Sequence, residues 1–147
     1  MSTRRDALNL IGGLAALAAI PFAVKTLSGR AGAATSPATI EVLAMGHWPV
    51  QDALKPVRAA LAKFGERVRV VDVDIESPEG EKRAKAIGLK GHIPIVILIN
   101  GSKSFKRPDG RTVEFVNFPA ASSNPMGLNG AWTVSDFEAA VQAAVGP

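Results

Sequence analysis

The sequence of 147 residues contains no cysteine and no tyrosine. A chain without cysteine forms no disulfide, has no thiolate nucleophile, and offers no cysteine ligand to zinc or to an iron–sulfur cluster. It also lacks the acylated cysteine of bacterial lipoproteins. Dithiol–disulfide exchange is therefore excluded as an activity. No Ser-His-Asp or paired-carboxylate constellation stands out either, so the sequence favours a protein that is not an enzyme.

The net charge of +4 makes nucleic acid the first class of partner to consider. Four of the 17 basic residues and one of the 13 acidic residues precede Ala34, which leaves 13 Lys and Arg against 12 Asp and Glu. So nearly neutral a domain lacks the electrostatic footprint that phosphate binding needs. A remaining basic cluster around a turn is interpreted as a solvated hairpin; its members are Lys103, Lys106, Arg107 and Arg111. We therefore predict no nucleic-acid partner.

The first 33 residues have the three parts of an export leader. Arg4 and Arg5 give a basic start, residues 7–24 carry no charge, and Ala31 and Ala33 form a small-x-small cleavage signature. The Arg-Arg-x-x-Leu start resembles a twin-arginine export signal. The resemblance implies the twin-arginine export machinery as a partner and a periplasmic or otherwise exported location.

An uncleaved leader is the alternative, with residues 1–33 anchoring the chain in the inner membrane. Its uncharged stretch of 18 residues lies at the lower limit for spanning a bilayer, which takes about 20 residues. Gly12, Gly13 and Pro21 weaken its apolar character further. We therefore favour cleavage, and expect contact with the membrane only through this segment if it is retained.

A small-residue linker, residues 34–38, precedes a domain placed at residues 39–147. Apolar periodicity and turn signals predict its elements in this order: a strand at 39–45, an amphipathic helix at 50–64 that contains Pro56, a buried strand at 67–75, a helix from Ser77 to about Ile87, a strand at 94–99, an antiparallel extension at 102–117 and a helix after Thr133. The order β-α-β-α-β-β-α predicts an α/β fold in which helices flank a central mixed sheet.

This order resembles the thioredoxin-like fold, and two segments strengthen the resemblance. One is the bend Gly46-His47-Trp48-Pro49, which follows a strand and opens a helix. The other, Gly91-His92-Ile93-Pro94, is similar to the family's Gly-Ile-Pro-Thr segment, whose proline faces the active site. The family's two redox cysteines would fall at Trp48 and Gln51, so the resemblance implies the fold and the location of the site but not the activity.

The favoured hypothesis is an exported, noncatalytic binding or chaperone-like module that holds an unidentified protein or peptide and needs no cofactor. The predicted partner-binding residues are Gly46, His47, Trp48, Pro49, Gly91, His92, Ile93 and Pro94. Trp48 is interpreted either as a partner-facing side chain or as a cap over the core. Trp132 is expected to pack against the last helix.

Metal binding in the periplasm is the alternative function. His47 and His92 are the only histidines, and the resemblance places them on adjoining loops. With Met45 or Met126 nearby they could bind copper or zinc, because imidazole and thioether are suitable ligands for these ions. The simpler interpretation is that both histidines hydrogen-bond to loop backbone.

Three acidic residues, Asp72, Asp74 and Glu76, alternate with apolar residues near the end of a predicted strand. Carboxylates grouped in this way suggest a cation site. Solvated carboxylates at the end of a strand are the preferred explanation.

Overall fold

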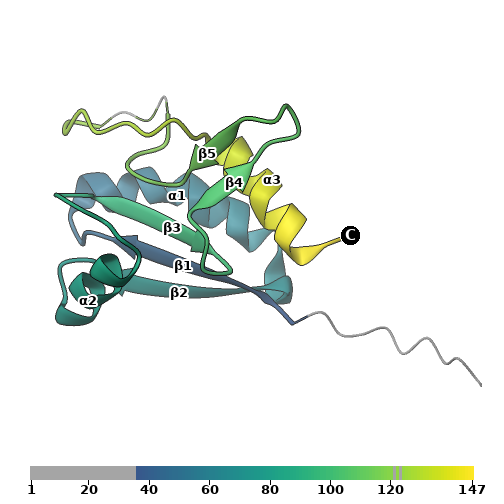
Figure 1. The fold of residues 1–147 in the computed structure, drawn as a ribbon, viewed down its shortest axis with the longest axis horizontal. Coiled ribbons are helices and arrows are strands. Elements are labelled where there is room, and N and C mark those ends of the chain that lie inside the picture. Colours follow the sequence, from purple (N-terminus) through teal and green to yellow (C-terminus); the bar gives the residue numbers. More distant parts are fainter. Residues whose placement is uncertain (1–35, 121, 123) are drawn as a thin grey trace, which may run out of the picture. The chain divides into compact units, whose positions relative to one another are not determined.

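A mixed sheet of three strands organises the residues described by the computed structural model, which are 36–120, 122 and 124–147 (Figure 1). The central strand, β1 (Ala38–Ala44), pairs in parallel with β2 (Val68–Asp74) and antiparallel with β3 (Ile95–Ile99). The order across the sheet is β2-β1-β3. The α/β fold with a central mixed sheet is therefore confirmed.

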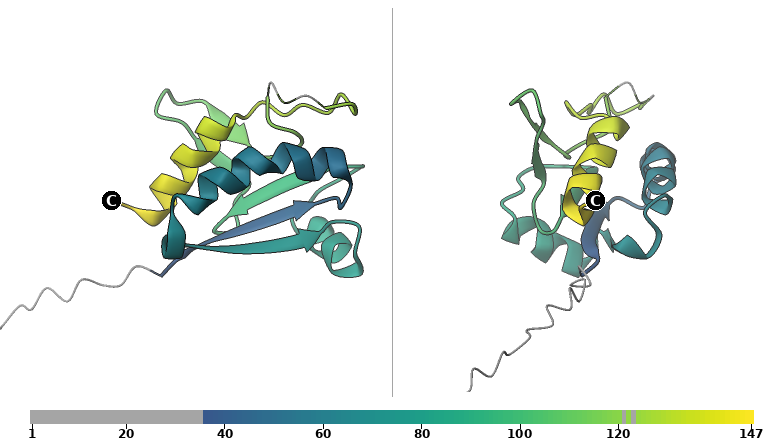
Figure 2. Two further views of the ribbon diagram at one scale, coloured as in Figure 1. Left: turned by 180° about the vertical axis from the view of Figure 1, so that it is seen from behind. Right: turned by 90° about the vertical axis from the view of Figure 1, so that its right-hand side faces the viewer.

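Helices lie on both faces of the sheet (Figure 2). α1 (Trp48–Ala62) and α3 (Val134–Val145) share one face, where α3 contacts α1, β1 and β3. On the other face, α2 (Pro78–Ala86) packs against β2, and its Arg83 forms a bidentate pair with Glu41 of β1, with both N···O distances 2.8 Å. The short 3-10 helix η1 (Gly65–Arg67) leads into β2.

Side-chain caps fix the starts of α2 and α3. The hydroxyl of Ser77 accepts a hydrogen bond from the Gly80 N–H at 3.0 Å. Thr133 and Asp136 form a reciprocal capping box, in which each side chain accepts from the other residue's N–H. Such caps satisfy backbone donors that the first turn of a helix leaves without partners.

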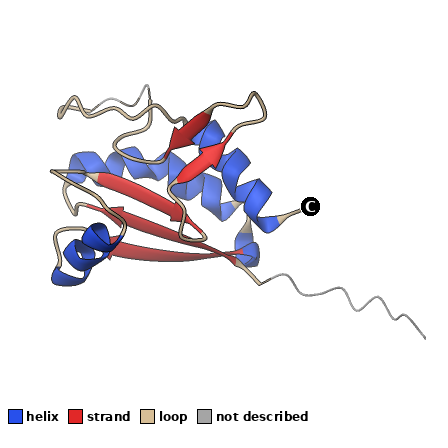
Figure 3. Cartoon of the chain, in the orientation of Figure 1, coloured by secondary structure: helices blue, strands red, loops and turns tan. Residues whose placement is uncertain are grey.

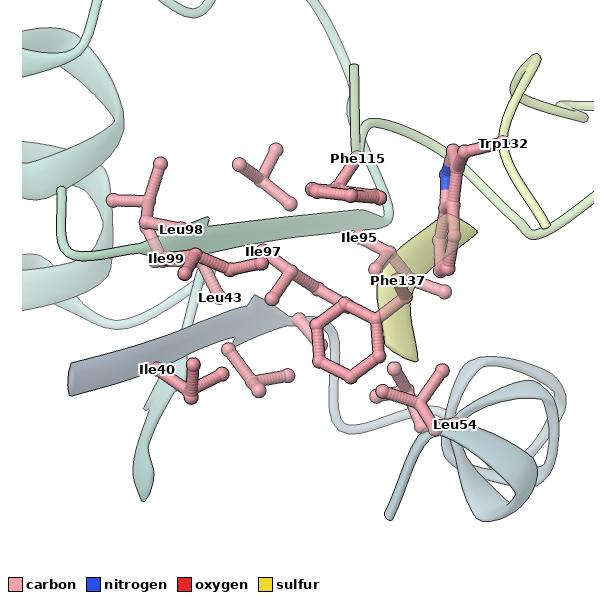
Figure 4. Packing of buried hydrophobic residues seen from close by; sticks show 14 of the residues in the cluster. Ile40, Leu43, Leu54, Ile95, Ile97, Leu98, Ile99, Phe115, Trp132 and Phe137 are labelled. Atoms are coloured by element: carbon pink, nitrogen blue, oxygen red, sulfur yellow. The ribbon is translucent and has the colours of Figure 1, made fainter. Parts of the chain in front are cut away.

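The core lies mainly between the sheet and the helix pair α1 and α3 (Figure 4). Alternate residues of β1 and β3 point toward those helices, and every residue of β3 is buried. Trp132 is fully buried as well, with its ring centroid 5.5 Å from that of Phe115 and 6.5 Å from that of Phe137 in α3. Its indole N–H donates to the Val116 carbonyl at 3.1 Å. The expected packing of Trp132 against the last helix is confirmed.

The expectation of a buried strand at 67–75 is wrong. β2 alternates between half-buried and exposed residues, and within 67–75 Ile75 alone is buried. The reason is position, because β2 is an edge strand and α1 leaves 40% of Val70 exposed. Valine-rich runs suit covered strands and edge strands alike, so composition did not distinguish them.

The predicted antiparallel extension contains two short strands, β4 (Ser104–Lys106) and β5 (Thr112–Glu114) (Figure 3). The observed order is therefore β-α-β-α-β-β-β-α, with one strand more than predicted. Beyond β5 the chain runs antiparallel to β3, since Ile97 N–H donates to the Phe115 carbonyl at 2.9 Å and Asn117 N–H donates to the Ile95 carbonyl at 2.8 Å. This segment continues the sheet on the outer side of β3.

The basic cluster on the hairpin is largely paired with acids. Lys103 pairs with Glu114, Arg111 with Asp109, and Arg107 with Asp136, the last at 3.1 Å. The Arg111 guanidinium, hydrogen-bonded to Asp109, lowers the pKa of that carboxyl. These pairs fit the interpretation of a solvated hairpin.

The predictions for the leader, at Arg4, Arg5, Ala31 and Ala33, concern residues that lie outside the described ranges. Among the described residues, no helix has the length and the hydropathy needed to cross a membrane.

Candidate functional site

Two predicted segments meet at the end of the sheet where β1 finishes and β3 begins. Because β1 and β3 are antiparallel neighbours, the residues after Ala44 and before Ile95 lie side by side. A hydrogen bond from Met45 N–H to the Pro94 carbonyl, 3.0 Å long, joins them directly. The structure therefore brings the bend at 46–49 next to the segment 91–94, as expected.

Trp48 projects from this end of the molecule with 76% of its surface exposed. The backbone explains why: the His47 carbonyl accepts the first helical hydrogen bonds, from Val50 and Gln51, and Pro49 occupies the first turn. Val50 takes the inward position and is fully buried. The interpretation of Trp48 as a cap over the core is wrong, and the partner-facing interpretation is the one that the exposure permits.

Gln51 occupies the second position at which the resemblance would place a redox cysteine. Its side-chain amide donates to the Met45 carbonyl at 2.7 Å. This bond holds the first turn of α1 against the end of β1. Gln51 thus fixes the bend from which Trp48 projects.

The segment 91–94 presents backbone groups without partners. Pro94 is buried and its carbonyl is used by Met45. Among the described residues, none hydrogen-bonds to the backbone N–H or C=O of Gly91, His92 or Ile93. Gly91 has φ of +81°, a left-handed conformation that glycine adopts without strain. An unpaired backbone stretch of this kind can accept an added strand.

A hollow of about 440 Å³ opens beside this segment. Its apolar lining includes Met45, Ile75, Leu89 and Ile93. Its polar lining carries both signs of charge and comes from Glu76, Glu81, Lys85 and His92. The floor is apolar and the rim is polar, a combination typical of small binding sites.

The sequence interpretation missed the contribution of α2 to this hollow. Glu81, Ala84 and Lys85 lie on α2, which follows β2 after a short turn. A signal was available, because the predicted parallel pairing of the first two strands brings their carboxyl ends to one edge of the sheet. A helix that starts just after the second strand must therefore begin near the end of the first.

The His47 side chain makes no hydrogen bond to backbone in the described part of the chain. Its Nε2 lies 3.1 Å from Glu76 Oε2, and both side chains are substantially exposed. His92 lines the hollow, as does Glu76, and has no side-chain hydrogen bond within the described ranges. The expectation that both histidines hydrogen-bond to loop backbone is therefore wrong. Glu76, which contacts His47, lines the same hollow as His92.

The candidate metal ligands are His47, His92 and Met45, of which His47 does not line the hollow. Met45 and His92 line the same hollow, although Met45 is only 2% exposed. Met126 lies in the loop between Phe118 and Trp132 and is partly exposed. In the described part of the chain, no three His, Cys, Asp or Glu side chains gather closely enough to hold a metal ion.

The strand-end carboxylates have separate partners. Asp72 pairs with Arg58 of α1, with Arg58 Nη2 2.8 Å from Asp72 Oδ1. Asp74 accepts a hydrogen bond from the Glu76 N–H at 3.0 Å, and Glu76 reaches His47. This arrangement fits solvated carboxylates at the end of a strand.

Comparison with known proteins gives no match to a family model, to a curated protein or to a solved structure.

Proposed function

We propose that this chain is an exported, noncatalytic module with a thioredoxin-like fold that binds an extended segment of a protein or peptide. The site is the one formed by Gly46–Val50 and Gly91–Pro94, together with the hollow beside them. One observation carries the proposal: a tryptophan with 76% of its surface exposed lies in the bend that Met45 joins to Pro94, and the backbone N–H and C=O groups of Gly91, His92 and Ile93 have no partner among the described residues.

The topology supports the thioredoxin-like part of the proposal. β1, α1 and β2 form a parallel unit, and β3 pairs antiparallel with β1 on its other side. The segment at 115–117 adds a further antiparallel partner to β3, and α3 follows it in the chain. The absence of cysteine removes redox chemistry from such a scaffold but leaves its binding edge in place.

Binding at this site combines three contacts. The partner's backbone pairs with that of His92 and Ile93 in the manner of an added strand, which gives affinity for any extended segment. Trp48 covers an apolar side chain of the partner, since exposed aromatic residues supply much of the energy in protein interfaces. A second side chain enters the hollow, where Lys85 and the glutamates on the rim accept either sign of charge.

The proposal that the chain is exported rests on the features of residues 1–33 alone. Its paired arginines, uncharged stretch and small-x-small signature motivate delivery to the periplasm by the twin-arginine machinery. A module that binds extended segments there would meet newly exported chains before they fold. Fractionation of cells that produce the protein tests this part, and recovery from the cytoplasm alone would contradict it.

The direct test is binding of a permanently unfolded protein, reduced and carboxymethylated lactalbumin labelled with fluorescein, followed by anisotropy. We expect Trp48→Ala to weaken binding by roughly thirtyfold, the equivalent of about 2 kcal/mol for an interface residue of this kind. Trp48→Phe is the matched control, because it keeps an aromatic ring at the same place and should retain most of the affinity.

A second variant, His92→Ala, changes the proposed site, and Lys106→Ala changes a residue of β4 outside it. Comparing the affinities of these two variants for the unfolded protein separates an effect of the site from a general effect of changing the surface. Equal affinity of the wild type, Trp48→Ala and His92→Ala would contradict the proposed site.

Metal binding remains the second candidate, because Glu76 contacts His47 and lines the same hollow as His92 and Met45. Calorimetric titration of the full-length chain with Cu(I) and with Zn(II) tests it. Stoichiometric binding lost in both His47→Ala and His92→Ala supports a metal site. Binding that survives both changes, or no binding, leaves peptide binding as the function.

A further inference from the structure

Two asparagines in the described part of the chain precede a glycine, and the structure holds them differently. Asn100 is followed by Gly101, and Asn129 is followed by Gly130. An asparagine before a glycine is prone to cyclisation, because glycine has no side chain to keep its backbone nitrogen away from the neighbouring carboxamide. The sequence makes the two pairs equivalent, so a difference in their reactivity must come from the fold.

Asn100 and Gly101 form an exposed two-residue turn. Ile99 and Ser102 exchange backbone hydrogen bonds of 2.8 and 3.0 Å across it, and φ is +49° at Asn100 and +83° at Gly101. Positive φ at both central residues is the mark of a type I′ turn. Both residues are exposed, and among the described residues none accepts a hydrogen bond from the Gly101 N–H. Solvent base can therefore reach this nitrogen.

The Asn100 carboxamide is held by the start of β1. Its Oδ1 accepts a hydrogen bond from the Thr39 N–H at 2.8 Å, and the Asn100 N–H donates to the Thr39 carbonyl at 2.8 Å. A donor on Oδ1 draws electron density from Cγ and stabilises the negative charge that develops on this oxygen when a nucleophile adds. The contact with Thr39 therefore activates the carboxamide.

Asn129 and Gly130 lie in a crowded setting. The Gly130 N–H donates to the Phe118 carbonyl at 2.7 Å, so the nitrogen that would attack is already engaged. A Cβ added at Gly130 would lie 2.2 Å from the Val116 carbonyl oxygen, whereas at Gly101 it would meet nothing within 4 Å. Ring closure at Asn129 requires the glycine to give up its hydrogen bond and to move against close neighbours.

We propose that Asn100 is a site of spontaneous modification, converted to aspartate and isoaspartate by its own turn, and that the fold protects Asn129. The Gly101 nitrogen loses its proton to solvent base and forms a bond to Asn100 Cγ. The bond from Cγ to Nδ2 breaks, and Nδ2 takes up a proton from water and leaves as ammonia. Water then adds to the cyclic imide and opens either of its two C–N bonds, so the net reaction consumes water, releases ammonia and involves no oxidation or reduction.

The modification acts at the far end of β1 from the proposed binding site. Thr39 lies near the start of β1, whereas the bend that carries Trp48 follows its last residue, Ala44. Isoaspartate lengthens the backbone of the turn by a methylene group, so the pairing of the chain on either side of the turn is disturbed. The proposal does not depend on peptide binding, and its failure would leave that function untouched.

Both asparagines can be followed in one sample of the full-length chain, incubated at mildly alkaline pH and then digested with trypsin. The protease separates them, because Asn100 lies between Lys90 and Lys103 and Asn129 lies after Arg111. Mass spectrometry measures the gain of mass at each asparagine, and chromatography separates aspartate from isoaspartate. A parallel sample in urea gives the rates without the fold. Asn100→Gln is the matched control, because it keeps a carboxamide but must close a larger and slower-forming ring.

In the folded chain we expect Asn100 to react at least about tenfold faster than Asn129, because reaction at Asn129 must first break the Gly130 hydrogen bond. In urea the two rates should be similar, and glutamine at position 100 should stay intact. Equal rates in the folded chain overturn the proposal, as does an Asn100 that stays intact there. A ratio that is the same with and without urea also overturns it, because the fold would then not be its cause.

Discussion

The two tryptophans of this chain occupy opposite kinds of environment. Trp132 is fully buried, stacks edge-on against Phe115 and has its indole N–H satisfied by a carbonyl. Trp48 is 76% exposed. Packing in the core accounts for an aromatic residue at position 132. No packing in the fold accounts for an aromatic residue at position 48. We therefore propose that Trp48 contacts a partner.

Replacing the two tryptophans should separate stability from binding, with the largest effect at Trp132. Trp132→Ala empties a site in the aromatic cluster and should cost about 3–5 kcal/mol of unfolding free energy. Trp48→Ala should change it by less than about 0.5 kcal/mol, as surface substitutions usually do. Urea denaturation followed by circular dichroism measures both. Comparable losses in the two variants would mean that Trp48 belongs to the core after all.

Two glycines, one near each tryptophan, should show the same difference in stability cost with smaller values. A Cβ added at Gly130 would lie 2.2 Å from the Val116 carbonyl oxygen and 2.7 Å from Trp132 Cδ1, so Gly130→Ala should cost about 1–3 kcal/mol. A Cβ added at Gly46 meets nothing within 4 Å, and Gly46→Ala should be nearly neutral for stability. Thermal unfolding of both variants checks this, and a neutral Gly130→Ala would show that the Trp132 region is loosely packed.

Losing the side chain before the first turn should cost more unfolding free energy at α3 than at α1, by roughly 0.5–1 kcal/mol. Thr133→Ala removes the capping box and should cost about 1 kcal/mol. His47, at the start of α1, makes no capping hydrogen bond with its side chain, so His47→Ala should cost less than half as much. Denaturant titration under identical conditions compares them. If His47→Ala proves the more costly change, its contact with Glu76 contributes more than an exposed pair ordinarily does.

The smallest expected effect is a pH dependence in the hairpin region. The Lys103 ammonium, hydrogen-bonded to Glu114, lowers the pKa of that carboxyl in the folded chain. Its stabilising contribution is therefore present above the unfolded pKa of about 4.3 and is lost as pH falls through the folded pKa. Glu114→Gln and Lys103→Met should each make stability less sensitive to acid below about pH 4.5. Unchanged acid sensitivity in both variants would contradict the assignment.

Much of the fold was predictable because its signals are local. The apolar run of β3, the caps at Ser77 and Thr133, and the turn between β4 and β5 act over a few residues. The burial of β2 was predicted wrongly, because whether a strand is central or at an edge depends on how the whole sheet is ordered.

One part of the site was predictable because the resemblance of the element order to the thioredoxin-like fold implied which loops adjoin. The two segments were expected to adjoin, and the bond from Met45 to Pro94 joins them. The contact between His47 and Glu76 and the share of α2 in the hollow were missed, because each depends on side chains brought together from separate elements.

The most direct test follows the two indole N–H signals in a 15N-labelled sample of the full-length chain, with the buried Trp132 indole as the internal reference. Reduced, carboxymethylated lactalbumin is added while the amide spectrum is followed. We expect the Trp48 indole and the amides of His92 and Ile93 to shift or broaden together, while the buried Trp132 indole stays in place. A spectrum in which these signals do not move, or in which only distant residues respond, would contradict the central claim that this end of the molecule binds extended chains.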